Sequence, residues 1–161
     1  MRSLISRFVM CFLAITLLCV MPCMVFASGT VAGPVAKKVQ VDGRVQRVEL
    51  AYTFTADGEA AMAEATLNPA TYGITGWYLY EVKCDPGSTG PSNGAWDVDI
   101  TDSSGYLQSQ NHLDDLSSSA TSVYRFASST YPMLWDAWTI SIGDNAVNSA
   151  TATIYLIFTS N

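Results

Sequence analysis

Few residues of this chain could perform acid–base or nucleophilic chemistry. Its one histidine, His112, lies in a segment rich in Ser and Asp. A hydrolase of the Ser-His-Asp kind needs a nucleophile, a base and a group that orients the base, and no such set is recognisable near His112. Asp114 and Asp115 follow it but look like ordinary loop acids. The sequence therefore predicts a solvated loop histidine in a protein that is not an enzyme and uses no cofactor.

Three aspartates lie close enough in sequence to be considered as metal ligands. Asp97 and Asp99 would project from the same face of a strand, and Asp102 follows shortly after. Hard cations such as Ca²⁺ bind clustered oxygen atoms, but this run lacks the loop geometry and the glycine position of an EF-hand. Outward positions of a half-buried strand also carry acids without any metal. The sequence favours no metal site and leaves Asp97, Asp99 and Asp102 as weak calcium candidates.

Cys84 is the one cysteine beyond the N-terminal region. It shares its parity with Tyr78, Tyr80 and Val82 within the run 76–84, and we expect this set to face inward. A buried cysteine behaves as a small apolar residue and is inert. An exposed Cys84, the alternative, could form an intermolecular disulfide.

Aromatic residues offer stacking as another kind of chemistry. The chain has four tryptophans and eight tyrosines, and core packing accounts for most of them. Exposed aromatic rings can stack on sugars. Trp77 is expected on the outward face of its strand and Trp135 in a loop, so these two are the candidates for surface recognition. A glycan is the partner that they would suit.

The elements that position these residues are short strands. From Lys38 onward, runs rich in Val, Ile, Tyr and Thr alternate with clusters of Gly, Pro, Asn, Asp and Ser, which is typical of antiparallel sandwiches and barrels. We predict one all-β domain over residues 38–161, a single antiparallel β-sandwich of about 7–9 strands, jelly-roll or Ig-like.

Two local patterns predict particular strand pairs. Asp57-Gly58 separates the runs 47–55 and 59–67, and Asp-Gly between two such runs predicts a tight hairpin. The runs 137–142 and 150–158 are expected to pair antiparallel across a short turn. The second of these runs mixes Thr alternation with an apolar stretch, so it should be central and covered on both faces over its second half.

Two further segments are clear from their composition. Trp96, Val98 and Ile100 alternate with polar residues, which predicts a half-buried strand with its acids toward solvent. The segment 85–94 holds two prolines and three glycines and must be a loop.

The first 27 residues have the pattern of a secretory signal peptide. Arg2 and Arg7 precede an uncharged apolar run over 8–26, which closes on a small residue at Ala27. Cleavage after Ala27, or up to about two residues later, would leave 28–37 as a flexible leader and place the domain in the periplasm or outside the cell. The run is also long enough for an uncleaved anchor, the alternative and the only membrane attachment that we expect.

Charge and cysteine content limit the binding partners and the disulfides that are expected for the chain. The chain has 14 acidic and 8 basic residues and a net charge of −6, and cleavage would remove two bases and no acid. This balance argues against nucleic acid as a partner. Cleavage would also remove Cys11, Cys19 and Cys23, which leaves Cys84 without an intramolecular disulfide partner.

Three segments resemble small all-β proteins from the structural modules of tailed phages and prophages. The segment 79–91 contains a D-P-G-x-T-x-P loop at 85–91, the segment 97–105 resembles that family's D-[IV]-x-[IL]-T-D-x-x-G strand and turn, and 138–156 resembles its C-terminal strands. The resemblance covers residues 45–158. It implies a compact β-sandwich in a virion-associated setting, with no catalytic residue to carry over.

Two functions follow from these observations. The first is an exported, non-catalytic structural or interaction protein that works through protein contacts or self-association, on a virion if the gene belongs to a phage. The second is a secreted or periplasmic carbohydrate-binding module, which export and the aromatic residues favour.

Overall fold

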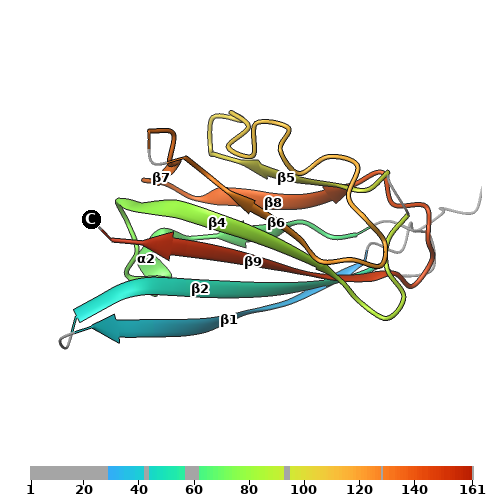
Figure 1. Ribbon diagram of the computed structural model, residues 1–161, viewed down its shortest axis with the longest axis horizontal. Helices are drawn as coiled ribbons and strands as arrows, with labels where there is room; N and C mark the ends of the chain where they lie inside the picture. Colours follow the sequence, from blue (N-terminus) through green and yellow to red (C-terminus); the bar gives the residue numbers. More distant parts are fainter. Residues whose placement is uncertain (1–28, 42–43, 57–61, 93–94, 128, 161) are drawn as a thin grey trace, which may run out of the picture.

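The computed structural model describes residues 29–41, 44–56, 62–92, 95–127 and 129–160 (Figure 1). Within these ranges the protein is all-β, as predicted, with antiparallel sheets and one short helix, α2 (Pro69–Tyr72). The strands are β1 (Thr30–Val41), β2 (Arg44–Thr55), β3 (Ala65–Leu67), β4 (Trp77–Pro86), β5 (Asp97–Thr101), β6 (Ser122–Arg125), β7 (Met133–Leu134), β8 (Trp138–Gly143) and β9 (Thr151–Thr159).

The strands form two sheets that face each other (Figure 1). The larger sheet has the order β1, β2, β9, β4, β6, with β7 also paired to β4, and the smaller has the order β3, β8, β5. Side chains from both sheets meet in one buried cluster that includes Phe54, Trp96, Trp138 and Phe158. The two sheets therefore share a single core.

Strand pairs are nested along the chain. β2 pairs with β9, β3 with β8, and β4 with β6 and β7. Two isolated bridges, Thr101 to Leu107 and Trp96 to Leu116, place the segment 107–116 beside β5. Strands that follow one another in sequence consequently tend to lie in different sheets.

Nesting overturns both predicted strand pairs. The runs 47–55 and 59–67 do not form a hairpin, because β2 pairs with β1 and β9 whereas β3 lies in the other sheet. The turn at Asp57-Gly58 lies outside the described residues. The runs 137–142 and 150–158 do not pair either, because β8 lies between β3 and β5 and β9 lies between β2 and β4.

The central position predicted for the last strand is confirmed. Ile154, Leu156 and Phe158 face the core, while Ile157, on the opposite side of β9, is only 2% exposed. The predicted coverage of both faces therefore holds at Ile157, whereas Tyr155 and Thr159 on the same outer face are half-buried. The strand predicted around Trp96, Val98 and Ile100 is confirmed as well, with these three side chains buried.

β4 faces the core differently from the prediction. Val82 and Cys84 are buried as expected, but Leu79 is buried too and Tyr80 is only half-buried. Leu79 lies opposite Phe158 and Glu81 opposite Ile157, so β4 has one extra residue at this point. Such a β-bulge reverses the alternation of side chains along the strand. Tyr78 and Tyr80 therefore do not belong to the inward set.

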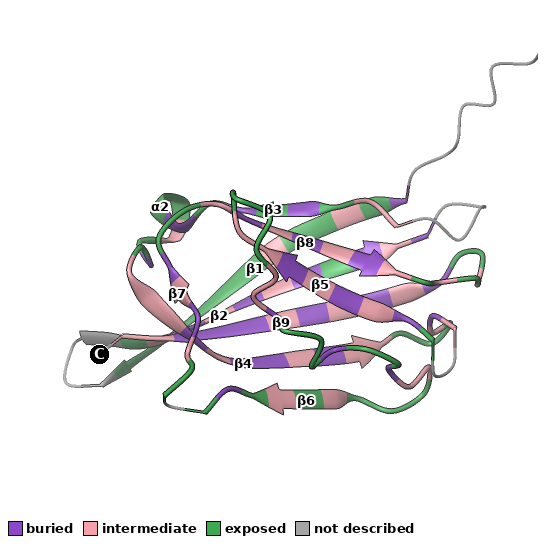
Figure 2. Ribbon diagram, turned by 90° about the horizontal axis from the view of Figure 1, so that it is seen from above, coloured by how far each residue is buried: buried purple, intermediate pink, exposed green. Residues whose placement is uncertain are grey.

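The expected flexible leader is largely a strand. β1 (Thr30–Val41) begins eight residues before Lys38, and it pairs with β2 along its length. Gly33 enables an irregularity in this pairing, since its φ of +108° suits glycine and a Cβ would lie 2.6 Å from the carbonyl oxygen of Ala51. β1 is the edge of the larger sheet, and Figure 2 shows most of it exposed.

No helix within the described ranges is long and apolar enough to cross a membrane. The expected signal segment, 1–27, lies outside those ranges.

Candidate functional site

His112 lies exposed on the segment beside β5. Its ring stacks on that of Tyr124 from β6, with centroids 4.3 Å apart and planes 15° from parallel. Tyr124 in turn contacts Phe126 edge-on at 4.9 Å. Within the described part of the chain, no hydrogen bond joins the His112 side chain to a hydroxyl, thiol or carboxylate. The contact of this ring is thus an aromatic stack that joins the two segments.

The three aspartates considered as calcium ligands do not form one metal-binding group. Asp97 accepts a hydrogen bond from the backbone N–H of Asp115 at 2.7 Å. Asp102 accepts bonds from the N–H groups of Ser104 and Tyr106, from the Ser104 hydroxyl and from the Gln108 amide. Over the described residues, no group of three or more His, Cys, Asp or Glu side chains could hold a metal ion. Asp102 thus organises the turn that follows β5.

The same surroundings move the pKa values of two of these acids in opposite directions. Burial raises the pKa of Asp99, and the nearby charges of Asp114, Asp97 and Asp144 raise it further. Hydrogen bonds from the Ser104 hydroxyl and the Tyr106 N–H lower the pKa of Asp102.

We expect the substitution Asp99→Asn to stabilise the protein at pH 7. The ionised Asp99 carboxylate costs folding free energy above its folded-state pKa, and protonation relieves that cost as the pH falls through this pKa toward the unfolded value. The gain should be below about 1 kcal/mol, because solvent screens much of the repulsion. It should vanish near pH 3. Thermal melts of the two proteins at pH 7 and pH 3 measure the difference.

Asp102→Asn is the matched control, because its effect on stability at pH 7 should have the opposite sign. A lowered folded-state pKa stabilises the protein above the unfolded pKa and loses this effect in acid. Asp102→Asn should therefore lower the melting temperature at pH 7, and this difference should shrink as the pH falls through the folded-state pKa of Asp102. An Asp99→Asn protein that melts lower than the parent at pH 7 would contradict the repulsion described above.

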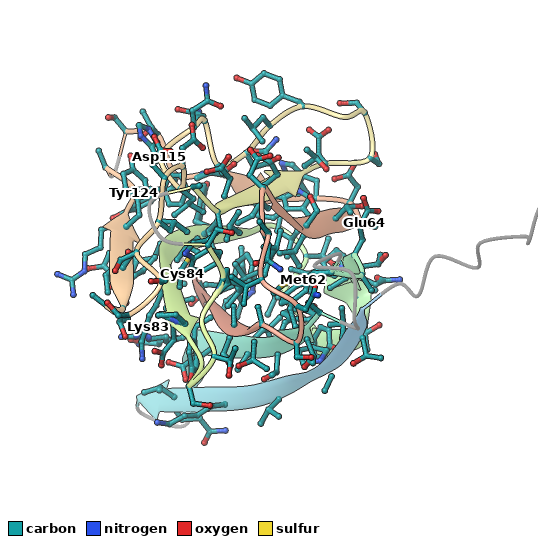
Figure 3. The ribbon with its side chains drawn as sticks, turned by 90° about the vertical axis from the view of Figure 1, so that its right-hand side faces the viewer. Met62, Glu64, Lys83, Cys84, Asp115 and Tyr124 are labelled. Atoms are coloured by element: carbon teal, nitrogen blue, oxygen red, sulfur yellow. The ribbon has the colours of Figure 1, made fainter. Side chains whose placement is uncertain are left out.

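Cys84 is buried between the sheets, as its position in Figure 3 shows. Burial raises the pKa of its thiol to about 12. Because the thiolate is the reactive form, Cys84 is inert at neutral pH. The predicted burial of Cys84 is confirmed, even though the bulge moved its expected neighbours Tyr78 and Tyr80.

The two tryptophans chosen for surface recognition differ in exposure. Trp135, in the loop between β7 and β8, is 67% exposed, and its ring lies over Gly76, where an added Cβ would be 3.3 Å from the indole. Trp77 is half-buried and packs against the core. The structure therefore leaves Trp135, but not Trp77, open for stacking on a ligand.

The bulge in β4 creates an aromatic group that sequence parity did not predict. Tyr131 lies with its ring centroid 6.4 Å from that of Tyr78 and 6.0 Å from that of Tyr80. We call these three residues the tyrosine cluster. All three are half-buried, so part of each ring remains accessible near the strand that leads to Trp135.

A charged pair joins β4 to β6 on the outer side of the larger sheet. The Arg125 side chain donates from Nε to the carboxylate of Glu81 at 2.5 Å. This bond raises the pKa of Arg125. Glu81 is only 8% exposed, so a partner is needed to offset the cost of burying its charge. The role of this pair is to hold the two strands in register.

The D-P-G-x-T-x-P segment begins within β4, because Asp85 and Pro86 pair with β9 instead of belonging to the predicted loop, and the residues after them are closely packed. The N–H of Gly87 donates to the carbonyl of Thr151, and the N–H of Thr151 donates to the carbonyl of Thr89. A Cβ on Gly87 would lie 1.8 Å from the Thr151 hydroxyl, and one on Gly90 would lie 2.0 Å from the carbonyl oxygen of Ser118. The two glycines therefore permit close approach of other chain segments.

Another exposed feature is the segment 35–39 of β1, which we call the β1 edge. Val35 is 72% and Val39 is 42% exposed, and Ala36, Lys37 and Lys38 are exposed between them. The smaller sheet does not cover this strand, so side chains on both of its faces reach solvent (Figures 2 and 3). This surface was not predicted from the sequence, because most of β1 was expected to be a flexible leader.

Comparison with known proteins does not identify a family. No family model matches the chain, and no curated protein matches it. The solved structures that resemble the chain do so only distantly.

Two of the similar structures come from phage capsids. A chain in the acidic stable capsid structure of Helicobacter pylori bacteriophage KHP30 has a TM-score of 0.41 and 11% identity, over 78% of this chain and 94% of that one. A chain of the cyanophage Pam1 capsid asymmetric unit has a TM-score of 0.38 and 15% identity, over 84% and 88%. The C-terminal family 22 carbohydrate binding module of Clostridium thermocellum Xyn10B has a TM-score of 0.34 and 15% identity, over 84% and 88%.

The structure thus separates the residues singled out in the sequence. His112, Cys84 and the three aspartates do not converge on one site, whereas Trp135 and the β1 edge are open to a partner.

Proposed function

We propose that this chain is a non-catalytic structural or interaction protein that acts through contacts with other protein chains. The observation that carries the proposal is the β1 edge, because a strand at the rim of a sheet presents backbone groups that another chain can pair with. Most natural proteins shorten or cover such strands. Here a strand of 12 residues has no neighbour on one side among the residues that the structure describes.

The nested strand pairs support a jelly-roll assignment for the sandwich. β2 and β9, β3 and β8, β4 and β6, and β5 with the segment 107–116 form four successive pairs along the chain. A jelly roll is built from two sheets of this kind, whereas the Ig-like alternative has a different strand distribution. Jelly rolls serve in both capsid and lectin domains, so the fold alone does not decide the function.

The proposal includes export, with virion association if the gene is carried by a phage. The signal-peptide pattern over 1–27 supports export, and the resemblance carried by 79–91, 97–105 and 138–156 supports a phage structural module. The protein would then act in the periplasm, outside the cell or on a virion.

The test is to isolate the full chain from its source after chemical cross-linking. We expect light scattering to show a species larger than the monomer, and mass spectrometry to identify cross-links to a second copy or to one recurrent protein. A protein that stays monomeric and uncross-linked at its native concentration would contradict the proposal.

Carbohydrate binding is the second candidate, and the exposure of Trp135 favours it. An indole that is 67% exposed and rests on a glycine offers a flat apolar face to a sugar ring, and the tyrosine cluster could extend that face. Retention on immobilised polysaccharides that is lost in Trp135→Ala would support this function. A blank glycan array at high protein concentration would remove it.

A further inference from the structure

Among the described residues, no strand pairs with the outer side of the β1 edge, so backbone hydrogen-bonding groups are open there at defined positions. Between β2 and β9, the N–H of Ser160 donates to the carbonyl of Gln46 at one end of the ladder, and the N–H of Ala56 donates to the carbonyl of Ala150 at the other. Residues of an antiparallel strand alternate between bonding one neighbour and bonding the other. The even-numbered residues of β2 therefore bond β9, and its odd-numbered residues bond β1.

This alternation fixes which groups of β1 point outward. Lys37 lies opposite Glu49 of β2, so Lys37 bonds β2. Its neighbours Ala36 and Lys38 consequently direct their N–H and C=O groups away from β2, toward the open side of the sheet. A strand that is added there could hydrogen-bond to both the N–H and the C=O group of each of these two residues.

The β1 edge is also the basic part of an acidic protein. β1 (Thr30–Val41) contains Lys37 and Lys38 and no acidic residue, whereas the whole chain has a net charge of −6. Ion pairs between described residues join Lys83 to Asp85 and Arg125 to Glu81, so neither lysine of β1 takes part in one. Lys37 and Lys38 project from opposite faces of the strand, because neighbouring residues alternate.

Antiparallel pairing of two copies through this edge is unfavourable in each register that pairs the outward groups of Ala36 and Lys38 with one another. Pairing Ala36 with Lys38 of the second copy puts the two Lys37 side chains opposite each other, and pairing Lys38 with Lys38 also opposes like charges, which destabilises a sheet. Pairing Ala36 with Ala36 puts Lys38 opposite Pro34, which has no N–H to donate. The charges thus favour a different occupant.

We infer that the β1 edge is the docking site for an extended acidic segment of a partner protein, which adds as a strand beside β1. The inference rests on the proposed function and names the chemistry of the partner. The segment would carry two consecutive carboxylates opposite Lys37 and Lys38, one on each face of the sheet. Apolar residues on its outer face would cover Val35 and Val39, which are 72% and 42% exposed. Backbone bonds would supply affinity and the carboxylates would supply selectivity.

The test uses the full chain and three fluorescent, end-capped peptides that differ at two positions. Each peptide has a central Glu-Glu, Gln-Gln or Lys-Lys pair flanked by alternating Thr and Val. By fluorescence anisotropy, the Glu-Glu peptide should bind about tenfold more tightly than the Gln-Gln peptide, since each exposed charge pair contributes modestly, and the Lys-Lys peptide should not bind. The Glu-Glu preference should shrink at high salt.

Hydrogen exchange and matched variants locate the binding. In the presence of the Glu-Glu peptide, the amides of 35–39 should exchange more slowly. Ala36→Pro removes one outward N–H and should weaken all peptide binding, whereas Ala36→Ser retains the N–H and should bind as the parent does. Lys38→Gln should reduce the Glu-Glu preference about threefold. This variant tests the inference even if Ala36→Pro does not fold.

Equal affinity for the Glu-Glu and Gln-Gln peptides would overturn the inference. Slowed exchange only outside β1, or dimerisation of the chain through β1 in the absence of peptide, would also overturn it. A chain that ignores all three peptides but cross-links to a protein through another surface would overturn this inference and leave the proposed function standing.

Discussion

A chain that lacks residues 154–161 should lose its cooperative thermal unfolding transition. The truncation removes all of β9 (Thr151–Thr159) beyond Thr153, including the buried side chains of Ile154, Leu156 and Phe158. It also separates β2 from β4, because β9 is the only strand between them in the larger sheet, as far as the structure describes it. Each large apolar residue contributes about 2–5 kcal/mol, and a domain of this size has only about 5–15 kcal/mol of stability.

Near-ultraviolet circular dichroism and calorimetry measure the loss, since both report fixed packing of the aromatic core. The control is a chain that lacks residues 160–161, which ends after Thr159 and keeps the whole of β9. That chain should retain a cooperative melt. A truncated protein without 154–161 that still melts cooperatively would show that β9 is dispensable, contrary to its central position.

The strand predictions succeeded where burial alone determines the pattern. β9 and the strand that contains Val98 and Ile100 could be predicted from their side-chain alternation, because an inward face must be apolar wherever a sheet covers a core. The partners of β8 and β9 could not be predicted in the same way. A short turn between two strands suggests a hairpin, but in a nested sandwich the chain crosses to the other sheet at that point.

A local irregularity explains the second group of errors. Because of the extra residue at Tyr80, the side chains in the first part of β4 point to the opposite faces from those predicted. Alternation of side chains in the sequence gives no way to locate such an insertion. The tyrosine cluster was missed for that reason. Cys84 was placed correctly because it lies after the bulge, in the part of β4 that keeps its alternation up to Pro86.

The candidate surface could be predicted only in part. Trp135 was expected to be exposed because it lies between two runs, and the structure agrees. The β1 edge was missed because Gly33 and Pro34 break the pattern before Val35, and apolar and polar side chains do not alternate over 35–38. An exposed edge strand has no apolar face to bury, so hydrophobic periodicity gives little signal for it.

The substitution Phe158→Ala should destabilise the protein by about 3–5 kcal/mol. Phe158 of β9 is fully buried, and its ring lies 6.1 Å from that of Trp138, which comes from β8 in the other sheet. The substitution would leave a cavity where the two sheets meet. Urea unfolding measures the loss, and Thr159→Ala is the control, because the next residue on β9 is half-buried on the opposite face and should change stability by less than about 1 kcal/mol.

A double-mutant cycle separates the contact between the two rings from general loss of apolar volume. Phe158→Leu and Trp138→Leu each remove one ring and keep an apolar side chain, so the double variant is better suited to remain folded than one with two alanines. If the rings interact directly, the double variant should lose about 0.5–1.5 kcal/mol less than the summed losses of the single variants. Strict additivity would mean that the rings fill the core independently, and that the sheets are held together by apolar burial alone.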